Sequence, residues 1–264
     1  MKNLWNDIDV KKFKDDLALR VYTSRLLGQD PSLVLHGGGN TSVKITEKNI
    51  VGEDEQILYV KGSGWDLVSI EKAGFSPVRM AHMIKLAELD SLSDPQMVNE
   101  LKTQLTNSSA PGPSVETILH AILPFKYVDH THADAVVTIS NTLNGEDRIR
   151  EVYGDRVIVV PYVMPGFDLS KDVGRLFSEQ ATDKTEGMVL LSHGIFSFGA
   201  TAKEAYDRMI DLVDLAEQYL INQNAWELEK PLGDLTTKSI RNEVAKLRQG
   251  ISAIIGSPVL LNLT

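Results

Sequence analysis

Two histidines two positions apart, His130 and His132, point most directly to chemistry in this sequence. The segment 127–133 is typical of a strand end, and alternate side chains of a strand lie on the same face, so we expect both imidazoles to point the same way. Glu116 lies upstream and His193 lies about sixty residues downstream. Three imidazoles and a carboxylate suit zinc or a neighbouring divalent transition metal. Three protein ligands with an exchangeable fourth position are typical of a catalytic site.

The remaining histidines carry less information. His36, His82 and His120 occur singly, and isolated histidines are usually core or surface residues, so we expect no catalytic role for them. Glu116 lies in the predicted first turn of a helix, where the helix dipole favours a carboxylate in any case. Its significance therefore depends on its combination with the three histidines.

Two glycine-rich turns follow predicted strands, at 36–42 and at 61–64. Glycine lets backbone N–H groups approach an anion closely, and concave sets of N–H groups bind phosphate. Neither turn matches a nucleotide-binding fingerprint, because the first leads into a strand and the second lacks the P-loop pattern. Anion binding and ordinary tight turns both remain interpretations of these segments.

Composition narrows the range of functions. The 264 residues carry a net charge of −9, which argues against nucleic acid or an anionic membrane as the main partner. Cysteine is absent, so disulfides, cysteine-ligated zinc, iron–sulfur clusters and thiol nucleophiles are excluded. The N-terminal residues lack an apolar signal core, and no stretch approaches the roughly 20 apolar residues of a membrane span. We therefore expect a cytoplasmic protein.

Periodicity predicts alternating strands and helices. Ser76-Pro77 is a plausible start for a helix, and Thr201 with Glu204 forms a capping-box pattern. We expect a catalytic domain over 1–225 and a C-terminal extension over 226–264, in which a helix precedes a short apolar strand at 258–261. The predicted strands are 32–35, 41–45, 57–60, 127–132, 156–160 and 187–191. The predicted helices are 8–28, 76–87, 96–105, 115–123, 133–141, 146–153, 170–180, 201–220 and 238–252.

Taken together, these motifs resemble the class II aldolase/adducin family. Order and spacing agree over roughly 30–225. The opening residues 4–7 and the tail up to Leu261 further resemble the aldolase half of bifunctional rhamnulose-1-phosphate aldolase/lactaldehyde dehydrogenase proteins. The matching segments are Gly-Gly-Asn-Thr-Ser (38–42), Gly-Ser-Gly (62–64), Pro-Ser-Val-Glu (113–116), His-Thr-His-Ala (130–133) and Leu-Ser-His-Gly (191–194).

The resemblance implies a three-layer α/β/α fold with a central, mainly antiparallel sheet flanked by helices, and a homotetramer with sites at subunit interfaces. It implies a divalent metal, most simply Zn²⁺, on His130, His132 and His193. Glu116 would ligate the resting metal and then swing away to act as base, and Tyr153 of a neighbouring subunit would donate a proton. The implied phosphate-binding residues are Gly39, Asn40, Ser63, Gly64 and Ser114.

The implied activity is that of a class II, zinc-dependent aldehyde-lyase. It would cleave a ketose 1-phosphate of the rhamnulose or fuculose type to dihydroxyacetone phosphate and lactaldehyde. The family's usual Ser-Ser-Glu is replaced by Ser-Val-Glu at 114–116, which removes one hydroxyl that can contact phosphate. A sugar-phosphate epimerase, dehydratase or decarboxylase on the same fold remains an alternative, as does a non-catalytic adducin-like module.

Overall fold

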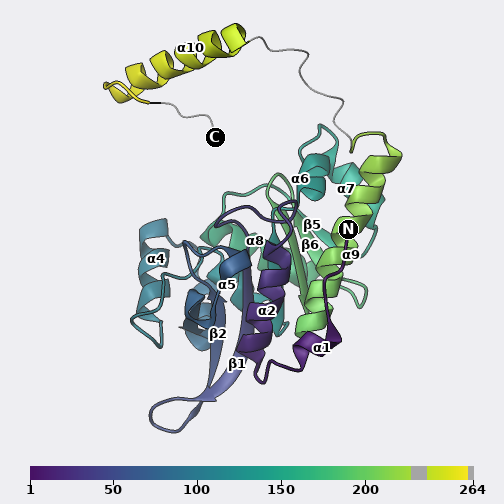
Figure 1. Ribbon diagram of the computed structural model, residues 1–264. Helices are drawn as coiled ribbons and strands as arrows, with labels where there is room; N and C mark the ends of the chain where they lie inside the picture. The colour runs from purple at the N-terminus through teal and green to yellow at the C-terminus, as the bar shows by residue number, and fades with distance from the viewer. Residues whose placement is uncertain (227–236, 261–264) are drawn as a thin grey trace. The chain divides into compact units, whose positions relative to one another are not determined.

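The computed structural model describes residues 1–226 and 237–260 (Figure 1). The chain divides into two compact units, Met1–Asn224 and Ala225–Thr264. Among the described residues, no helix combines the length and apolarity needed to cross a bilayer. The first unit holds all of the strands described below.

A seven-stranded mixed sheet forms the centre of the first unit, in the order β3-β2-β1-β4-β7-β6-β5. Every neighbouring pair is antiparallel except β5 and β6, which are parallel. The predicted mainly antiparallel sheet is therefore confirmed. The strands are β1 (Asn40–Lys48), β2 (Asp54–Lys61), β3 (Phe75–Arg79), β4 (Tyr127–Thr131), β5 (Val157–Val160), β6 (Gly187–Leu190) and β7 (Gly194–Gly199).

Helices cover both faces of this sheet, which confirms the three-layer arrangement. On one face α2, α6, α7 and α9 contact the strands, and on the other α3, α5 and α8 do so (Figure 1). The helices of this unit are α1 (Asp7–Val10), α2 (Asp16–Gly28), α3 (Met80–Ala87), α4 (Asp94–Thr103), α5 (Thr117–Ile122), α6 (Asp134–Ser140), α7 (Gly145–Tyr153), α8 (Phe167–Gln180) and α9 (Ala202–Asn222), with 3₁₀ turns η1 (Leu67–Ser69) and η2 (Lys72–Gly74).

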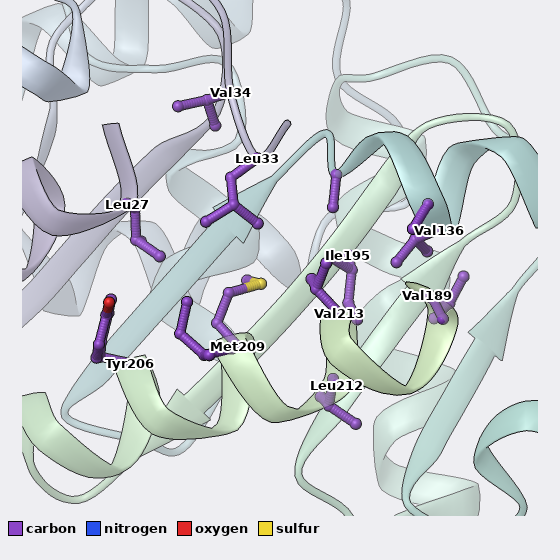
Figure 2. Packing of buried hydrophobic residues seen from close by; sticks show 14 of the residues in the cluster. Leu27, Leu33, Val34, Val136, Val189, Ile195, Tyr206, Met209, Leu212 and Val213 are labelled. Carbon is purple, nitrogen blue, oxygen red and sulfur yellow. The ribbon is translucent and has the colours of Figure 1, made fainter. Parts of the chain in front are cut away.

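Strand alternation divides the core between these two faces. In β6, Val189 belongs to the same buried cluster as Met209 and Val213 of α9 (Figure 2). Its neighbours Met188 and Leu190 belong instead to the cluster formed with α5 and α8. The same alternation in β4 directs His130 away from the α2 side, where its neighbour Asp129 forms a fully buried ion pair with Arg20, at 2.5 Å between Oδ1 and Nη1.

Two local predictions in the first half of the chain are corrected. Residues 32–35 form a turn and not a strand, because the Asp30 side chain accepts hydrogen bonds from the Ser32 N–H and hydroxyl, while Leu33 is buried without any strand partner. Ser76 and Pro77 lie in β3 and the helix begins only at Met80. Proline is tolerated there because β3 is an edge strand.

Two further differences are an interrupted helix and a strand that the sequence did not predict. The helix predicted over 8–28 is interrupted at 11–15, where Asp15 caps α2 by accepting from the Ala18 N–H. Strand β7 was not predicted, because its six residues begin and end with glycine and directly follow a three-residue turn. This strand has consequences for the site, since it pairs with β4.

The second unit contains α10 (Thr237–Ile255), in agreement with the predicted helix. The short apolar strand expected at 258–261 is not found over its described residues, 258–260, and Leu261 lies outside them. The physical reason is that the backbone of Val259 bonds to side chains of α10. Its N–H donates to Ser252 Oγ and its carbonyl accepts from Arg248 Nε.

Candidate metal centre and active site

Three imidazoles converge where β4 ends beside the turn between β6 and β7. His130 lies in β4, His132 directly follows that strand, and His193 lies in the turn. The pairing of Thr131 with Ile195 brings the two segments together. The Nε2 atoms of His130 and His132 are 3.1 Å apart, and one ligand atom from each of the three rings falls within 4.8 Å of the others. This cluster can surround one cation.

The environment keeps the imidazoles neutral. His130 is fully buried, donates from Nδ1 to the Ile195 carbonyl at 3.1 Å and stacks on Phe196, with ring centroids 4.1 Å apart. Burial holds the pKa of His130 well below its usual value, lowers the pKa of His132, and lowers the pKa of His193 to about 4. Because Nδ1 of His130 carries the proton that is donated to the Ile195 carbonyl, Nε2 has a lone pair available to bind a metal.

Glu116 lies between two of these histidines. Its Oε2 is 3.6 Å from His130 Nε2, and its Oε1 is 3.6 Å from His193 Nε2. The residue is only 4% exposed, at the N-cap of α5, and the Asn40 side-chain amide donates to its Oε2 at 2.5 Å. Burial raises the pKa of Glu116 to about 7, while Asn40 and the nearby Lys61 act in the opposite direction.

The donor set fits a divalent metal. Within the described residues, Glu116 Oε1 and His193 Nδ1 are buried without a hydrogen-bond partner, and an unsatisfied buried carboxylate oxygen is costly unless a cation or a proton accompanies it. Three neutral nitrogens and one carboxylate oxygen are the ligands that zinc and its neighbours accept. The residues that would hold the ion are therefore His130, His132, His193 and Glu116.

A pocket of about 330 Å³ opens beside the imidazoles and gathers the predicted site residues, with the exception of the fully buried His130 and of Tyr153. The Gly-Ser-Gly turn lies against 112–114, because the Ser63 N–H donates to the Gly112 carbonyl and the Ser114 N–H to the Lys61 carbonyl. The lining residues are Gly37, Gly38, Gly39, Asn40, Lys61, Gly62, Ser63, Gly64, Ser114, Val115, Glu116, His132, Pro165 and His193.

Lys61 is a pocket residue that sequence reasoning missed. It ends β2, is 4% exposed, and donates from Nζ to the Gly37 carbonyl at 2.8 Å, which joins the two glycine-rich turns. Burial lowers the pKa of Lys61, and the charges of Asp66 and Glu116 oppose this change. Its position at a strand end, directly before a glycine turn, was the signal that could have identified it.

Tyr153 is not part of the site, which corrects its predicted role. It is 3% exposed, it packs in the core between the sheet and α9, and its hydroxyl donates to the Leu212 carbonyl at 3.0 Å. Residues four apart share a helix face, so Tyr153 follows Ile149 into the interior of its own subunit. A group held there cannot deliver a proton to a neighbouring subunit.

The other histidines differ in position. His36 is exposed, and His82 pairs with Glu100 at 2.7 Å, so neither belongs to the cluster. His120 is fully buried, as a core histidine would be, but its Nε2 meets the side chain of Asn40. This contact links it to the pocket and was not expected from the sequence.

Comparison with known proteins agrees with this geometry. Residues 18–220 match the family described as class II aldolase and adducin N-terminal domain. The chain therefore belongs to the class II aldolase/adducin family. It is 37% identical over 227 residues to the uncharacterized oxidoreductase YuxG of Bacillus subtilis. The matched region covers 85% of this chain and 33% of that protein. The chain thus spans about a third of the length of this relative.

Two solved structures illustrate the fold. The N-terminal class II aldolase domain of a conserved protein from Thermoplasma acidophilum is similar, with 45% identity and a TM-score of 0.77 over 83% of this chain and 99% of that domain. An L-fuculose 1-phosphate aldolase shares the fold at 16% identity, with a TM-score of 0.54 over 89% of this chain and 97% of that one. Membership in this family supports a lyase-type enzyme, and class II aldolases are typically dependent on a divalent metal.

Proposed function

We propose that this chain is a metal-dependent aldolase that cleaves a ketose 1-phosphate of the rhamnulose or fuculose type to dihydroxyacetone phosphate and lactaldehyde. The observation that carries the proposal is the position of Glu116, whose two carboxylate oxygens each lie 3.6 Å from a different histidine of the cluster. A buried carboxylate beside a metal centre is suited to move a proton at the carbon next to a chelated carbonyl.

The residues divide the work between binding and proton transfer. A divalent cation held by the histidines would supply Lewis-acid polarisation of the substrate's carbonyl and hydroxyl oxygens. In the condensation direction Glu116 removes the proton from C3 of dihydroxyacetone phosphate, C3 bonds to the aldehyde carbon, and a neighbouring acid protonates the aldehyde oxygen. In the cleavage direction the sugar hydroxyl gives its proton to that neighbouring group, the carbon–carbon bond breaks, and Glu116 returns a proton to C3. Glu116 would be free to act as base once it no longer ligates the cation, and the Asn40 amide donates to its Oε2.

The pocket's charge supports a phosphorylated substrate. The protein carries a net charge of −9, so an anion is attracted only where a local site overcomes the overall field. Lys61 provides a buried cation beside the two glycine-rich turns, and Ser114 and Ser63 lie at the same pocket. We assign Gly39, Asn40, Ser63, Gly64 and Ser114 to phosphate binding, with Lys61 as an additional member.

The assay is direct. Metal-loaded protein is incubated with dihydroxyacetone phosphate and L-lactaldehyde, and sugar-phosphate formation is followed with and without a chelator. Formation that the chelator stops supports the aldolase. Conversion of pentulose or acidic sugar derivatives without condensation favours an epimerase, dehydratase or decarboxylase. A protein that holds no metal and turns over none of these substrates favours the adducin-like module. If the aldolase assay is positive, a panel of ketose 1-phosphates identifies the sugar.

We also propose Zn²⁺ as the native metal and a homotetramer as the assembly, in a cytoplasmic protein. Exposed apolar side chains near the pocket support an interface there, since Val115 lines the pocket at 43% exposure and Leu35, at 59%, lies two residues before Gly37. Elemental analysis of protein purified without added metal tests the first proposal. Sedimentation analysis of the same sample tests the second, and a monomer would contradict it.

A further inference from the structure

Behind the pocket, a line of side-chain hydrogen bonds runs from strand β1 through α5 to Glu116. Ser42 Oγ lies 2.8 Å from His120 Nδ1, His120 Nε2 contacts Asn40 Oδ1, and Asn40 Nδ2 lies 2.5 Å from Glu116 Oε2. We propose that His120 is a positioning residue, which orients the Asn40 amide and through it the Glu116 carboxylate. This inference rests on the proposed function of Glu116 as the base.

The partners determine the direction of every hydrogen bond in this line. A carboxylate only accepts, so Asn40 must present its NH₂ group to Glu116 and its carbonyl oxygen to His120. That oxygen also only accepts, so the proton of the neutral imidazole must lie on Nε2. His120 Nδ1 is then an acceptor for the Ser42 hydroxyl. A single tautomer of His120 is compatible with all three contacts.

The surroundings hold His120 rigidly. It is 0% exposed and packs edge-on against Phe196, at 5.5 Å between ring centroids, while the other end of the line is anchored in the sheet. Asn40 and Ser42 are two residues apart in β1 and so share a face. Glu116 is the N-cap of α5, and His120 lies four residues further on, one turn above it, with its N–H donating to the Glu116 carbonyl. The spacing in β1 therefore matches the spacing at the start of α5, so that Asn40 and Ser42 contact Glu116 and His120.

These hydrogen bonds matter for proton transfer because the side-chain amide of Asn40 can otherwise rotate. Without a donor at the Nε2 position of His120, Asn40 can turn its carbonyl oxygen towards the Glu116 carboxylate, where two acceptors repel each other. The carboxylate would then lose its only side-chain hydrogen bond among the described residues. His120 prevents this rotation from a position outside the pocket, since it is not among the lining residues.

A matched pair of variants separates positioning from packing. In His120→Gln the amide nitrogen falls near the former Nε2, so it can still donate to Asn40. In His120→Asn the shorter side chain reaches only the Nδ1 position, next to Ser42. Both variants place a neutral amide in the same cavity. Each is loaded with zinc, its metal content is measured, and deuterium exchange at C3 of dihydroxyacetone phosphate is followed.

We expect both variants to retain metal, with His120→Gln exchanging within about threefold of wild type and His120→Asn slower by roughly 10–100-fold. In an Asn40→Ala background this difference should vanish, because the residue through which His120 acts is gone. Equal rates for the two variants in the presence of Asn40, or an unchanged difference in its absence, would overturn the proposal.

A spectroscopic measurement on the wild-type protein is independent of activity and of any variant's folding. Nitrogen-15 NMR of protein labelled at histidine distinguishes the two neutral tautomers. The Nε2–H tautomer is expected for His120 at neutral pH, and the Nδ1–H tautomer would overturn the proposal. Absence of exchange in the wild-type protein would contradict Glu116 as base, while the tautomer would still report on the line itself.

Discussion

Asn40 and His130 lie directly opposite each other on the antiparallel strands β1 and β4. One member of this pair donates to Glu116, and the other presents its Nε2 atom 3.6 Å from the same carboxylate. Backbone pairing in the middle of the sheet thus determines the distance between Asn40, which supports the carboxylate, and the imidazole of His130. A one-residue register shift of either strand would move its member of the pair to the opposite face.

His193 should be required for metal binding. Although it is remote in sequence from the other two histidines, one ligand atom from each of the three lies within 4.8 Å of the others. We expect His193→Ala to weaken zinc binding at least roughly 100-fold, because the ion loses one of its three imidazole ligands. Titration calorimetry with zinc measures this loss. His82→Ala, at a histidine paired with Glu100, is the control and should bind as wild type; equal weakening in both variants would contradict the site.

Glu116→Gln should separate metal binding from proton transfer. The amide keeps the size of the carboxylate but cannot take a proton, while the three histidines remain in place. We expect zinc to stay largely bound and exchange at C3 of dihydroxyacetone phosphate to slow by about 10²–10⁴-fold. Mass spectrometry of the recovered substrate gives the rate. Exchange at the wild-type rate would remove Glu116 from its role as base.

Gly194 should tolerate no side chain. A Cβ atom there would lie 2.4 Å from the Thr131 carbonyl oxygen, 3.0 Å from His130 Cε1 and 3.2 Å from His132 Cδ2. We expect Gly194→Ala to lower the free energy of unfolding by about 1–3 kcal/mol and to weaken zinc binding, because backbone and two ligands must shift. Denaturant titration provides the comparison with Gly37→Ala, whose Cβ would meet nothing within 4 Å. Similar losses in the two variants would contradict this explanation.

Lys61→Met should weaken phosphate binding. The substitution keeps much of the side chain's length and removes a buried charge that lies at the pocket. A charge-assisted hydrogen bond contributes about 1.5–3 kcal/mol, so we expect the affinity for dihydroxyacetone phosphate to fall at least roughly tenfold. Binding of dihydroxyacetone, which lacks the phosphate, is measured alongside and should change little. Equal losses for both ligands would show that Lys61 supports the pocket without binding the anion.

Lys44 should make stability depend on pH. Burial lowers the pKa of Lys44 from 10.5 to about 8, and its ammonium donates to the Leu123 carbonyl. Between about pH 8 and pH 10 the unfolded chain retains a proton that the folded chain has released, so this lysine makes stability increase with pH over that window. The increase should amount to about 2 kcal/mol and should be missing in Lys44→Met.

Denaturant titrations at about pH 7.5 and pH 10 measure this difference between wild type and variant. Lys85→Met, at an exposed lysine of α3, is the control and should keep the increase. Tyrosines such as Tyr59, whose pKa is raised to about 12, begin to lower stability near pH 10, where a tyrosine of the unfolded chain ionises. This effect is the same in wild type and in both variants, so the difference between the proteins reports on Lys44 alone. If wild type and Lys44→Met change in parallel, the burial of Lys44 has no such consequence.

Local sequence patterns predicted elements well where the pattern had one structural solution. The alternation at 127–132 located β4, and the capping residue Thr201 preceded α9 by one position, with its side chain accepting from the Glu204 N–H. Patterns that are compatible with two kinds of element led to wrong predictions. Leu33 and Val34 are buried in a turn as completely as a strand would bury them, and Ser76-Pro77 begins a helix as readily as it forms part of an edge strand.

Residue types and spacing by themselves determined the chemical capacity of this protein: three imidazoles, a carboxylate and two glycine-rich turns. Only the tertiary structure decided which groups meet. Tyr153 and His120 are both buried, yet the packing of α7 directs Tyr153 into the core, while α5 places His120 against Asn40. Contacts between distant segments depend on strand pairing and helix packing, which arise from burial summed over the whole chain, and no local pattern records that sum.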